Sequence, residues 1–174
     1  MTTNGQSDRI EIEGLPLASQ YAGFARGKVS DNERAFPGLG TTIAYHPGSL
    51  GEATVYIYSK GLKDIADGPT SATITQEFVQ ATEDVLTAVA NKPNCKILLI
   101  DQYGTGSPQR GLEFLCSEFV LREPERTSRT FLYVTGTGGN FVKVRVTLRT
   151  NDPTDPTARN FADAVASGLW AAER

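Results

Sequence analysis

The 174-residue sequence contains one histidine and two cysteines, so the side chains that most often hold zinc are scarce. His46 alone cannot build a histidine-rich zinc site, and neither Cys95 nor Cys116 is spaced to complete one. Two cysteines are also too few for the set of disulfide bonds that stabilises small secreted domains. We therefore expect no metal or other cofactor and interpret both cysteines as small apolar side chains in strands. The sequence leaves open whether the two cysteines form a disulfide.

An excess of positive charge and long apolar stretches are both missing. The net charge of −3 argues against a general nucleic-acid binder, because such proteins need a basic surface to displace counterions. No apolar run approaches the ~20 residues that span a bilayer. The first residues, MTTNGQSDRIEIEG, lack the basic and apolar regions of a signal peptide. We expect a cytoplasmic protein, with an exported protein that has lost its leader as the alternative.

β-forming residues fill the segment 128–149, SRTFLYVTGTGGNFVKVRVTLR, on both sides of a glycine-rich break. In its second half, apolar and polar side chains alternate. The apolar set is Val142, Val144, Val146 and Leu148, and the polar set is Lys143, Arg145, Thr147 and Arg149. A period of two residues indicates a strand with one buried and one wetter face. The segment therefore predicts an antiparallel hairpin.

The whole chain predicts three strands, a helix, four strands and a second helix. Residues 1–18 are polar, and we predict a flexible arm there, followed by a single domain over 19–174. Outside the hairpin, strands are expected at 21–29, 41–46, 52–58, 95–101 and 113–122, and helices at 71–91 and 156–172. Segment 95–101, CKILLID, is apolar on both faces, as is typical of a central strand. We predict an α+β fold, an α/β/α sandwich around an antiparallel sheet of about six or seven strands.

Two segments resemble the PsbP-like fold. They are ATVYIYSKGLKDI, residues 53–65, and FLYVTGTGGNFVKVRVTLRTND, residues 131–152. This fold is shared by an extrinsic subunit of photosystem II, a nuclear protein that binds the Ran GTPase and many uncharacterised bacterial proteins. The resemblance implies a non-enzymatic docking domain, because several members act by binding other proteins. It supplies no partner-binding residue that matches this sequence one for one.

The polar face of the hairpin is the first candidate site. A three-residue turn at 137–139 would place Lys143 beside Tyr133 and Arg145 beside Phe131. Cations over aromatic rings attract each other and could form a partner-binding patch, which Arg149 would extend, with Arg129 as a further member. The alternative is a solvated or helix-covered face whose long side chains lie over the rings.

Other polar groups have ordinary structural explanations. The glycine-rich segments 104–107 and 136–139 are read as turns, because neither is followed by the lysine and hydroxyl of a phosphate-binding loop. His46 is read as a strand end. Asp152 and Asp155 fit a turn and a helix cap.

We predict a domain that binds another protein and performs no chemistry, with a homodimer through an edge strand also open. A small-molecule pocket between sheet and helix, carrying Tyr45, Tyr56 and Tyr58, is the alternative. A hydrolase using Asp101 or Cys116 is the third reading.

Overall fold

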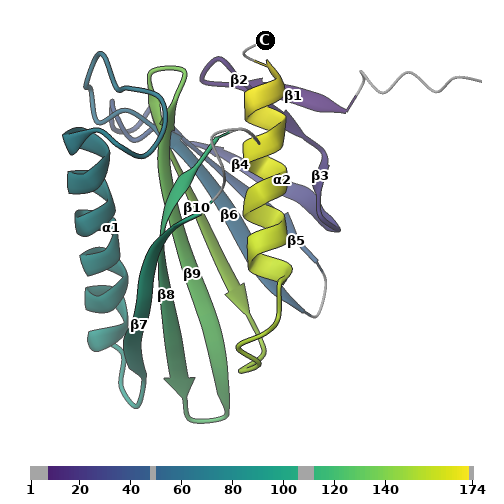
Figure 1. Cartoon of the computed structure of the whole chain (residues 1–174), viewed down its shortest axis with the longest axis vertical. Helices are drawn as coiled ribbons and strands as arrows, with labels where there is room; N and C mark the ends of the chain where they lie inside the picture. The colour runs from purple at the N-terminus through teal and green to yellow at the C-terminus, as the bar shows by residue number, and fades with distance from the viewer. Residues whose placement is uncertain (1–7, 48–49, 106–111, 173–174) are drawn as a thin grey trace, which may run out of the picture.

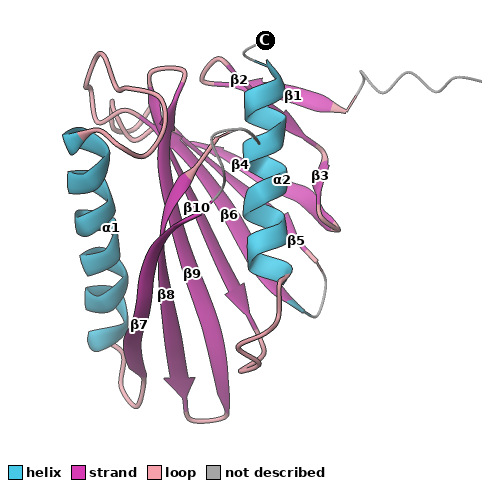
Figure 2. Ribbon diagram, viewed as in Figure 1, coloured by secondary structure: helices cyan, strands magenta, loops and turns pink. Residues whose placement is uncertain are grey.

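The computed structural model describes residues 8–47, 50–105 and 112–172 of the chain. It has an α+β fold, as predicted: one eight-stranded antiparallel sheet, a separate two-stranded hairpin, and helices α1 and α2 (Figures 1 and 2). Strand order in the large sheet is β3-β4-β5-β6-β10-β9-β8-β7. Neither helix is long and apolar enough to cross a membrane, within the part of the chain that is described.

The strands exceed the predicted number because the N-terminal region adds short ones. Their bounds are Arg9–Ile12 (β1), Leu15–Ala18 (β2), Gln20–Tyr21 (β3), Phe24–Asp31 (β4), Thr41–His46 (β5), Gly51–Tyr58 (β6), Lys96–Thr105 (β7), Phe114–Glu123 (β8), Arg126–Thr137 (β9) and Asn140–Leu148 (β10). The expected strand at 21–29 is divided between β3 and β4, which form a tight hairpin. Every neighbouring pair in the sheet is antiparallel.

The prediction of a flexible arm over residues 1–18 is wrong for its second half. β1 and β2 pair as a hairpin, and Leu15 and Leu17 of β2 are buried against α2 and the sheet. Alternation of leucine with Pro16 and Ala18 explains this, since a period of two turns both leucines to the same side. Residues 1–7 lie outside the described part of the chain.

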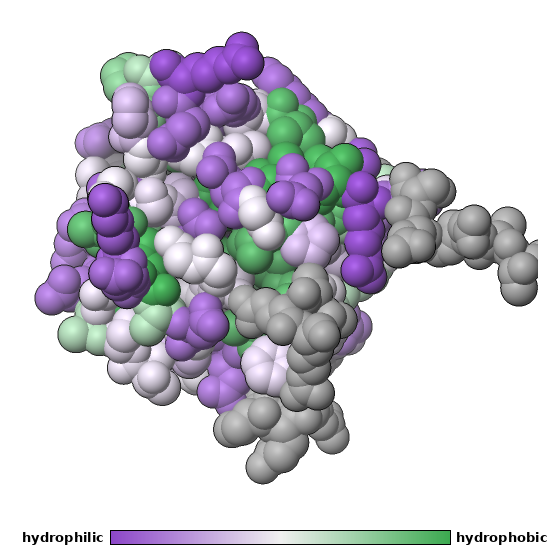
Figure 3. Space-filling view, turned by 90° about the horizontal axis from the view of Figure 1, so that it is seen from above, coloured by the Kyte–Doolittle hydropathy of each residue, from purple (hydrophilic) through white to green (hydrophobic). Residues whose placement is uncertain are grey.

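The two helices cover opposite faces of the large sheet. α1 (Ala72–Ala90) begins after Ser71, whose hydroxyl accepts the Ile74 N–H at 3.2 Å, and it packs mainly on β7, β8 and β9. α2 (Thr157–Ala172) begins beyond Asp155, whose carboxylate accepts the Thr157 N–H, and it packs on β2, β10, β9 and β3. Seen along the strands, hydrophobic side chains gather toward the middle of the molecule and hydrophilic ones lie mostly at its rim (Figure 3).

Each helix closes its own hydrophobic core, because successive strand residues point to opposite faces. The core under α2 includes Tyr45, Tyr133, Val142, Val144 and Phe161. The core under α1 includes Tyr58, Phe78, Phe119, Leu132 and Phe141. β10 supplies both cores, with Val142 on one side and Phe141 on the other.

The β9–β10 turn has two residues, not the predicted three. Thr137 pairs with Asn140 across Gly138 and Gly139, whose φ angles are 58° and 76°. Two left-handed residues are typical of the type I′ turn, which glycine adopts without steric cost. The shorter turn moves the strand pairing by one residue, so Lys143 lies opposite Val134 and not beside Tyr133.

The prediction that segment 95–101 is central in the sheet is wrong. β7 is an edge strand, and it pairs only with β8 (Figure 1). Its consecutive side chains Leu98, Leu99 and Ile100 are exposed. An apolar strand therefore lies where the described part of the sheet gives it a neighbour on one side only.

Candidate functional site

A small groove lies between α1 and the sheet, beside β10, which α1 does not cover because it packs on β7, β8 and β9. Its volume is about 130 Å³. It is lined by Tyr56, Ala81, Asp84, Val85, Ala88, Leu132, Lys143 and Arg145, and we call it the α1 groove. Ala81 and Ala88 leave it open, because an alanine fills little of the space between helix and sheet. Of the predicted site residues, it brings together Lys143 and Arg145.

Lys143 is half-buried in this groove. Its Nζ lies 4.5 Å from the centroid of the Tyr56 ring and 5.3 Å from that of Tyr58. Burial lowers the pKa of Lys143 below its usual value of 10.5, although the carboxylates of Glu77 and Asp84 act in the opposite direction. The predicted contact of Lys143 with Tyr133 is therefore wrong, and Lys143 instead lies over two tyrosines of β6, which neighbours β10 on its other side.

Arg145 is half-buried one strand period further along β10. Its Nε donates a hydrogen bond of 2.8 Å to Thr130 Oγ1, and Thr130 also contacts Thr147 Oγ1 at 2.9 Å. Burial lowers the pKa of the Arg145 guanidinium, which nevertheless stays charged at neutral pH. Neither Lys143 nor Arg145 forms an ion pair with a carboxylate in the described ranges.

The acidic side chains near the groove have other partners. Glu77 is buried and accepts hydrogen bonds from Lys60 Nζ and, at 2.6 Å, from the Tyr58 hydroxyl. Asp84 is exposed and accepts the Gln80 side-chain amide at 2.9 Å. The two cations of β10 therefore face the groove with their charge only partly balanced.

A second hollow follows the same edge of α1 toward its N-terminus. Its volume is about 280 Å³, and it is lined by Lys60, Leu62, Thr73, Gln76, Glu77, Gln80 and Phe141. The helical residues of the two hollows recur at intervals of three and four, so they share one side of α1. Together the hollows follow most of the helix, from Thr73 to Ala88.

The remaining residues of the predicted patch lie elsewhere. Tyr133 and Phe131 are buried under α2, with ring centroids 6.4 Å apart, because the pairing shift turns them away from the cations. Arg129 is buried on that face too and forms an ion pair with Glu118. Arg149 is exposed just beyond the end of β10. Sequence reasoning missed Tyr56 as the ring that meets Lys143, because the β6–β10 pairing joins segments far apart in the chain.

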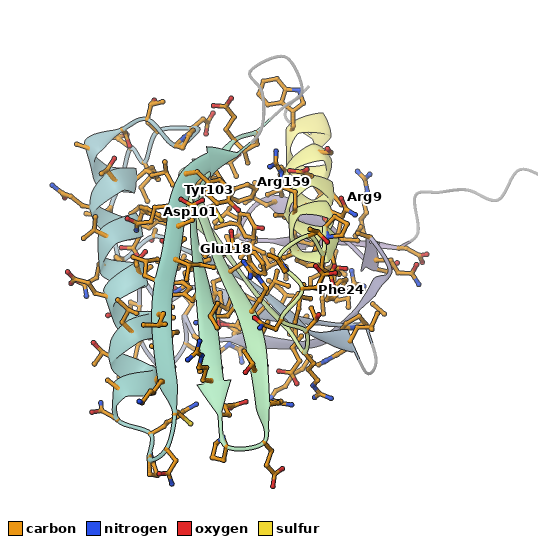
Figure 4. All side chains as sticks on the ribbon, turned by 60° about the horizontal axis from the view of Figure 1, so that its bottom comes forward. Arg9, Phe24, Asp101, Tyr103, Glu118 and Arg159 are labelled. Atoms are coloured by element: carbon orange, nitrogen blue, oxygen red, sulfur yellow. The ribbon has the colours of Figure 1, made fainter. Side chains whose placement is uncertain are left out.

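A second polar cluster lies on the α2 face of β7 and β8. Figure 4 shows Tyr103 on β7, Glu118 on β8 and Arg159 of α2 on the same side of the sheet. The Tyr103 hydroxyl donates to Glu118 Oε2 at 3.2 Å. Cys116 is fully buried here, and burial raises the pKa of its thiol to about 12. The thiol is therefore protonated at neutral pH, which disfavours a nucleophilic role.

The other residues considered as catalytic or metal-binding candidates can be placed as well. His46 is exposed at the end of β5, with its ring against Gly27, and Asp101 is exposed on β7. Asp152 accepts the Thr154 N–H and hydroxyl, and these bonds lower the pKa of its carboxyl. Both cysteines are free thiols. No group of three potential metal ligands occurs in the ranges that the structure covers.

The predicted tyrosine pocket and the first glycine-rich segment can also be placed. Tyr45 is buried on the α2 face and donates to the Ala18 carbonyl at 2.9 Å, so it cannot join Tyr56 in one pocket. The Tyr58 hydroxyl donates its hydrogen bond to Glu77 and so does not point into a pocket with Tyr56. Gly104 and Thr105 belong to β7, and the end of the 104–107 segment lies outside the described residues.

Comparison with known proteins adds a fold relationship. No protein-family model and no curated protein matches the chain. The solution structure of cyanobacterial PsbP (CyanoP) from Synechocystis sp. PCC 6803 is similar, with a TM-score of 0.52 and 17% sequence identity. The match covers 97% of this chain and 96% of that one. The chain thus has the PsbP-like fold that its hairpin and its β6 segment resemble.

Proposed function

We propose that this domain is a non-catalytic docking module, and that its α1 groove receives an acidic side chain of a protein partner. The observation that carries the proposal is the pair of half-buried cations, Lys143 and Arg145, with no carboxylate partner in the described structure. A buried charge costs free energy unless it is paired. A partner carboxylate would supply the missing counter-charge, and the guanidinium and ammonium would donate to its oxygens.

The size of the groove favours a side chain over a free ligand. Pockets for metabolites usually enclose about 300–1,000 Å³. The α1 groove, at about 130 Å³, has room for a carboxylate and a short stem. The second hollow along α1 would lie under neighbouring residues of a bound segment, which suits an extended or helical stretch of a partner protein.

The sheet beside the groove offers a further contact area. α1 packs mainly on β7 to β9, and the side chains of β5 and β6 on that face are only half-buried: Thr42, Ala44, Thr54 and Tyr56. Small and hydroxyl-bearing side chains with one aromatic ring form a flat, polar surface. A partner could therefore rest on this sheet while its acidic residue enters the groove.

The first experiment compares three forms of the protein as bait in lysate of the native host. They are the wild type, the Lys143→Glu/Arg145→Glu variant, and the control Lys28→Glu/Arg122→Glu, which makes the same charge change at exposed sites on β4 and β8 that do not line the groove. A photo-crosslinking residue at Thr54 would report whether the retained protein lies on the groove face. We expect one protein to be retained and crosslinked by wild type and control, with at least about tenfold less retained by the groove variant.

A partner held equally by the groove variant would contradict this proposal. A small molecule that co-purifies with wild type and is absent from the groove variant would instead favour the pocket alternative. That alternative keeps one supporting observation, namely that the groove lies between sheet and helix and carries Tyr56. Native mass spectrometry of each purified form separates the two outcomes.

A further inference from the structure

β7 combines the sequence of a central strand with the position of an edge strand. Leu98, Leu99 and Ile100 are 54%, 39% and 45% exposed, and they follow one another in the chain. Leu98 lies opposite Val120 on the α2 face, while Leu99 lies opposite Phe119 on the α1 face. Apolar side chains are therefore presented on both faces of the same free edge, a pattern typical of strands with a neighbour on each side.

The two edges of the sheet differ in their protection. The β3 edge has only two residues, and a very short edge strand offers little for another strand to pair with. β7 has ten residues, no proline and a single lysine, Lys96, at its start. Its protection is limited to a bulge between Leu99 and Asp101. One row of its backbone N–H and C=O groups thus has no strand partner in the described residues.

We propose that β7 is the interface of a homodimer in which the β7 strands of two copies pair antiparallel and join their sheets. Antiparallel pairing of identical strands follows from a two-fold axis perpendicular to the sheet, the symmetry of most dimers. Such an axis keeps α1 of both copies on one side of the joined sheet, so Leu99 of each copy meets apolar side chains of the other. The unpaired backbone groups of both edges are satisfied at the same time.

Charge at the two ends of the apolar stretch identifies a second copy as the occupant. Lys96 precedes the stretch, Asp101 follows it, and both side chains lie on the α2 face (Figure 4 shows Asp101). Because paired strands run in opposite directions, a pairing centred on Leu98 or Leu99 places Lys96 of one copy within one position of Asp101 of the other. This contact occurs twice by symmetry, and opposite charges across strands are stabilising. Neither residue forms an ion pair within the described chain.

The same arrangement limits assembly to two copies. Once the β7 edges have paired, the free edges of the joined sheet within the described residues are β3 and the part of β4 that β3 does not cover. β3 is too short to continue the pairing, and the free part of β4 carries Lys28 and Asp31 beside a bulge between Arg26 and Val29, so the assembly closes at two copies. The proposal is independent of the α1 groove, which involves β10 and lies away from the β7 edge.

The test is the mass of the full chain in solution, measured by sedimentation over a concentration series. We expect a dimer for the wild type and a monomer for Leu98→Lys/Ile100→Lys, because four added cations would face each other across the edge. Both replaced side chains are already exposed, so the fold should tolerate the change. Val79→Lys is the control: Val79 is 49% exposed on α1, and its replacement should leave the dimer intact.

A charge exchange tests the choice of a second copy. Lys96→Glu alone should weaken the dimer at least about tenfold, because it places like charges together, and Lys96→Glu/Asp101→Lys should restore it. Rescue by the double variant supports the proposal, since only a copy of the same chain carries both compensating residues. A wild-type monomer up to about 100 µM would overturn the proposal. A dimer unaffected by the two lysines on β7, or an open polymer, would overturn it as well.

Discussion

At the scale of single residues, Lys143 and Arg145 are the least usual feature of the molecule. Both cations are half-buried: Lys143 lies over the rings of Tyr56 and Tyr58, and Arg145 donates a hydrogen bond to Thr130. Burial lowers the pKa of both side chains, which means that the folded state disfavours their charged forms. Groups of this kind often persist because they serve binding at a cost in stability.

Replacing Lys143 by methionine should stabilise the protein at neutral pH by about 1 kcal/mol, since methionine keeps the apolar stem and removes the charge. The sign follows from linkage. Because the folded-state pKa of Lys143 lies below the unfolded value of 10.5, the unfolded state binds more protons between these two values, and stability rises with pH there. The advantage of Lys143→Met should therefore be complete at neutral pH and shrink as the pH approaches 10.5.

Urea denaturation of both forms at a series of pH values measures this difference. The matched control is Lys28→Met, at an exposed lysine of β4, where we expect a change within about 0.5 kcal/mol at any pH. A loss of stability in Lys143→Met at neutral pH would show that the contacts with Tyr56 and Tyr58 outweigh the cost of burial.

At the scale of elements, β9 is held to the loop before α1 by a close backbone approach. Gly136 and Gly68 exchange two hydrogen bonds of 2.8 and 3.2 Å, and Asp67 accepts the Gly138 N–H at 3.1 Å. A Cβ at Gly136 would lie 2.1 Å from the Ala66 carbonyl oxygen, and such atoms cannot approach so closely. This contact places the loop beside the hairpin and the start of α1 above the sheet.

Gly136→Ala should therefore destabilise the protein by about 2 kcal/mol or more, because backbone must move to admit the methyl group. Thermal or urea denaturation measures the loss. Gly104→Ala is the control within the same sheet, since its nearest atom, the Phe114 carbonyl oxygen, would lie 3.9 Å from the new Cβ. Equal costs for the two variants would mean that the loop does not pack on Gly136.

At the scale of the whole molecule, buried tyrosines in both cores make the stability of the protein depend on pH. Tyr45 and Tyr133 lie under α2 and Tyr58 lies under α1. Burial raises the pKa of all three hydroxyls above 10.0, and Glu77 raises that of Tyr58 further. The neighbouring Cys116 and Tyr103 raise the pKa of Tyr133 further, so ionisation there would be especially costly.

Stability should accordingly be constant with respect to these groups below pH 10 and fall above it. Above pH 10 the folded state keeps protons that the unfolded state has lost, so each tyrosine lowers the free energy of unfolding by up to about 1.4 kcal/mol per pH unit. The lowered pKa of Lys143 acts in the opposite direction, but the pKa values of Tyr21, Tyr103 and Cys116 are raised as well and add to the fall.

Urea denaturation above pH 10 measures how steeply the free energy of unfolding falls with pH. Tyr58→Phe should reduce this slope by the contribution of one tyrosine, up to about 1.4 kcal/mol per pH unit. An unchanged slope in Tyr58→Phe would show that the Tyr58 hydroxyl ionises in the folded protein.

Much of the secondary structure could be predicted from local patterns. The strand at 41–46, the helix capped by Ser71 and the C-terminal helix beyond Asp155 have the predicted limits to within a residue or two. The candidate site was predicted only in part. Lys143 and Arg145 share a half-buried face as expected, but Tyr133 and Phe131 do not face them. The hairpin turn was assigned one residue too many, and a shift of one residue exchanges the faces of a strand.

The sequence alone determined most of the segments that form strands and helices, though not β1 and β2, because period, caps and turn residues act between near neighbours in the chain. The order of the strands was decided only by the tertiary structure. Pairing of β10 with β6, which brings Tyr56 to Lys143, joins residues more than eighty positions apart. The edge position of β7 likewise depends on how the whole sheet assembles, since the sequence of an apolar strand does not show whether it has one neighbouring strand or two.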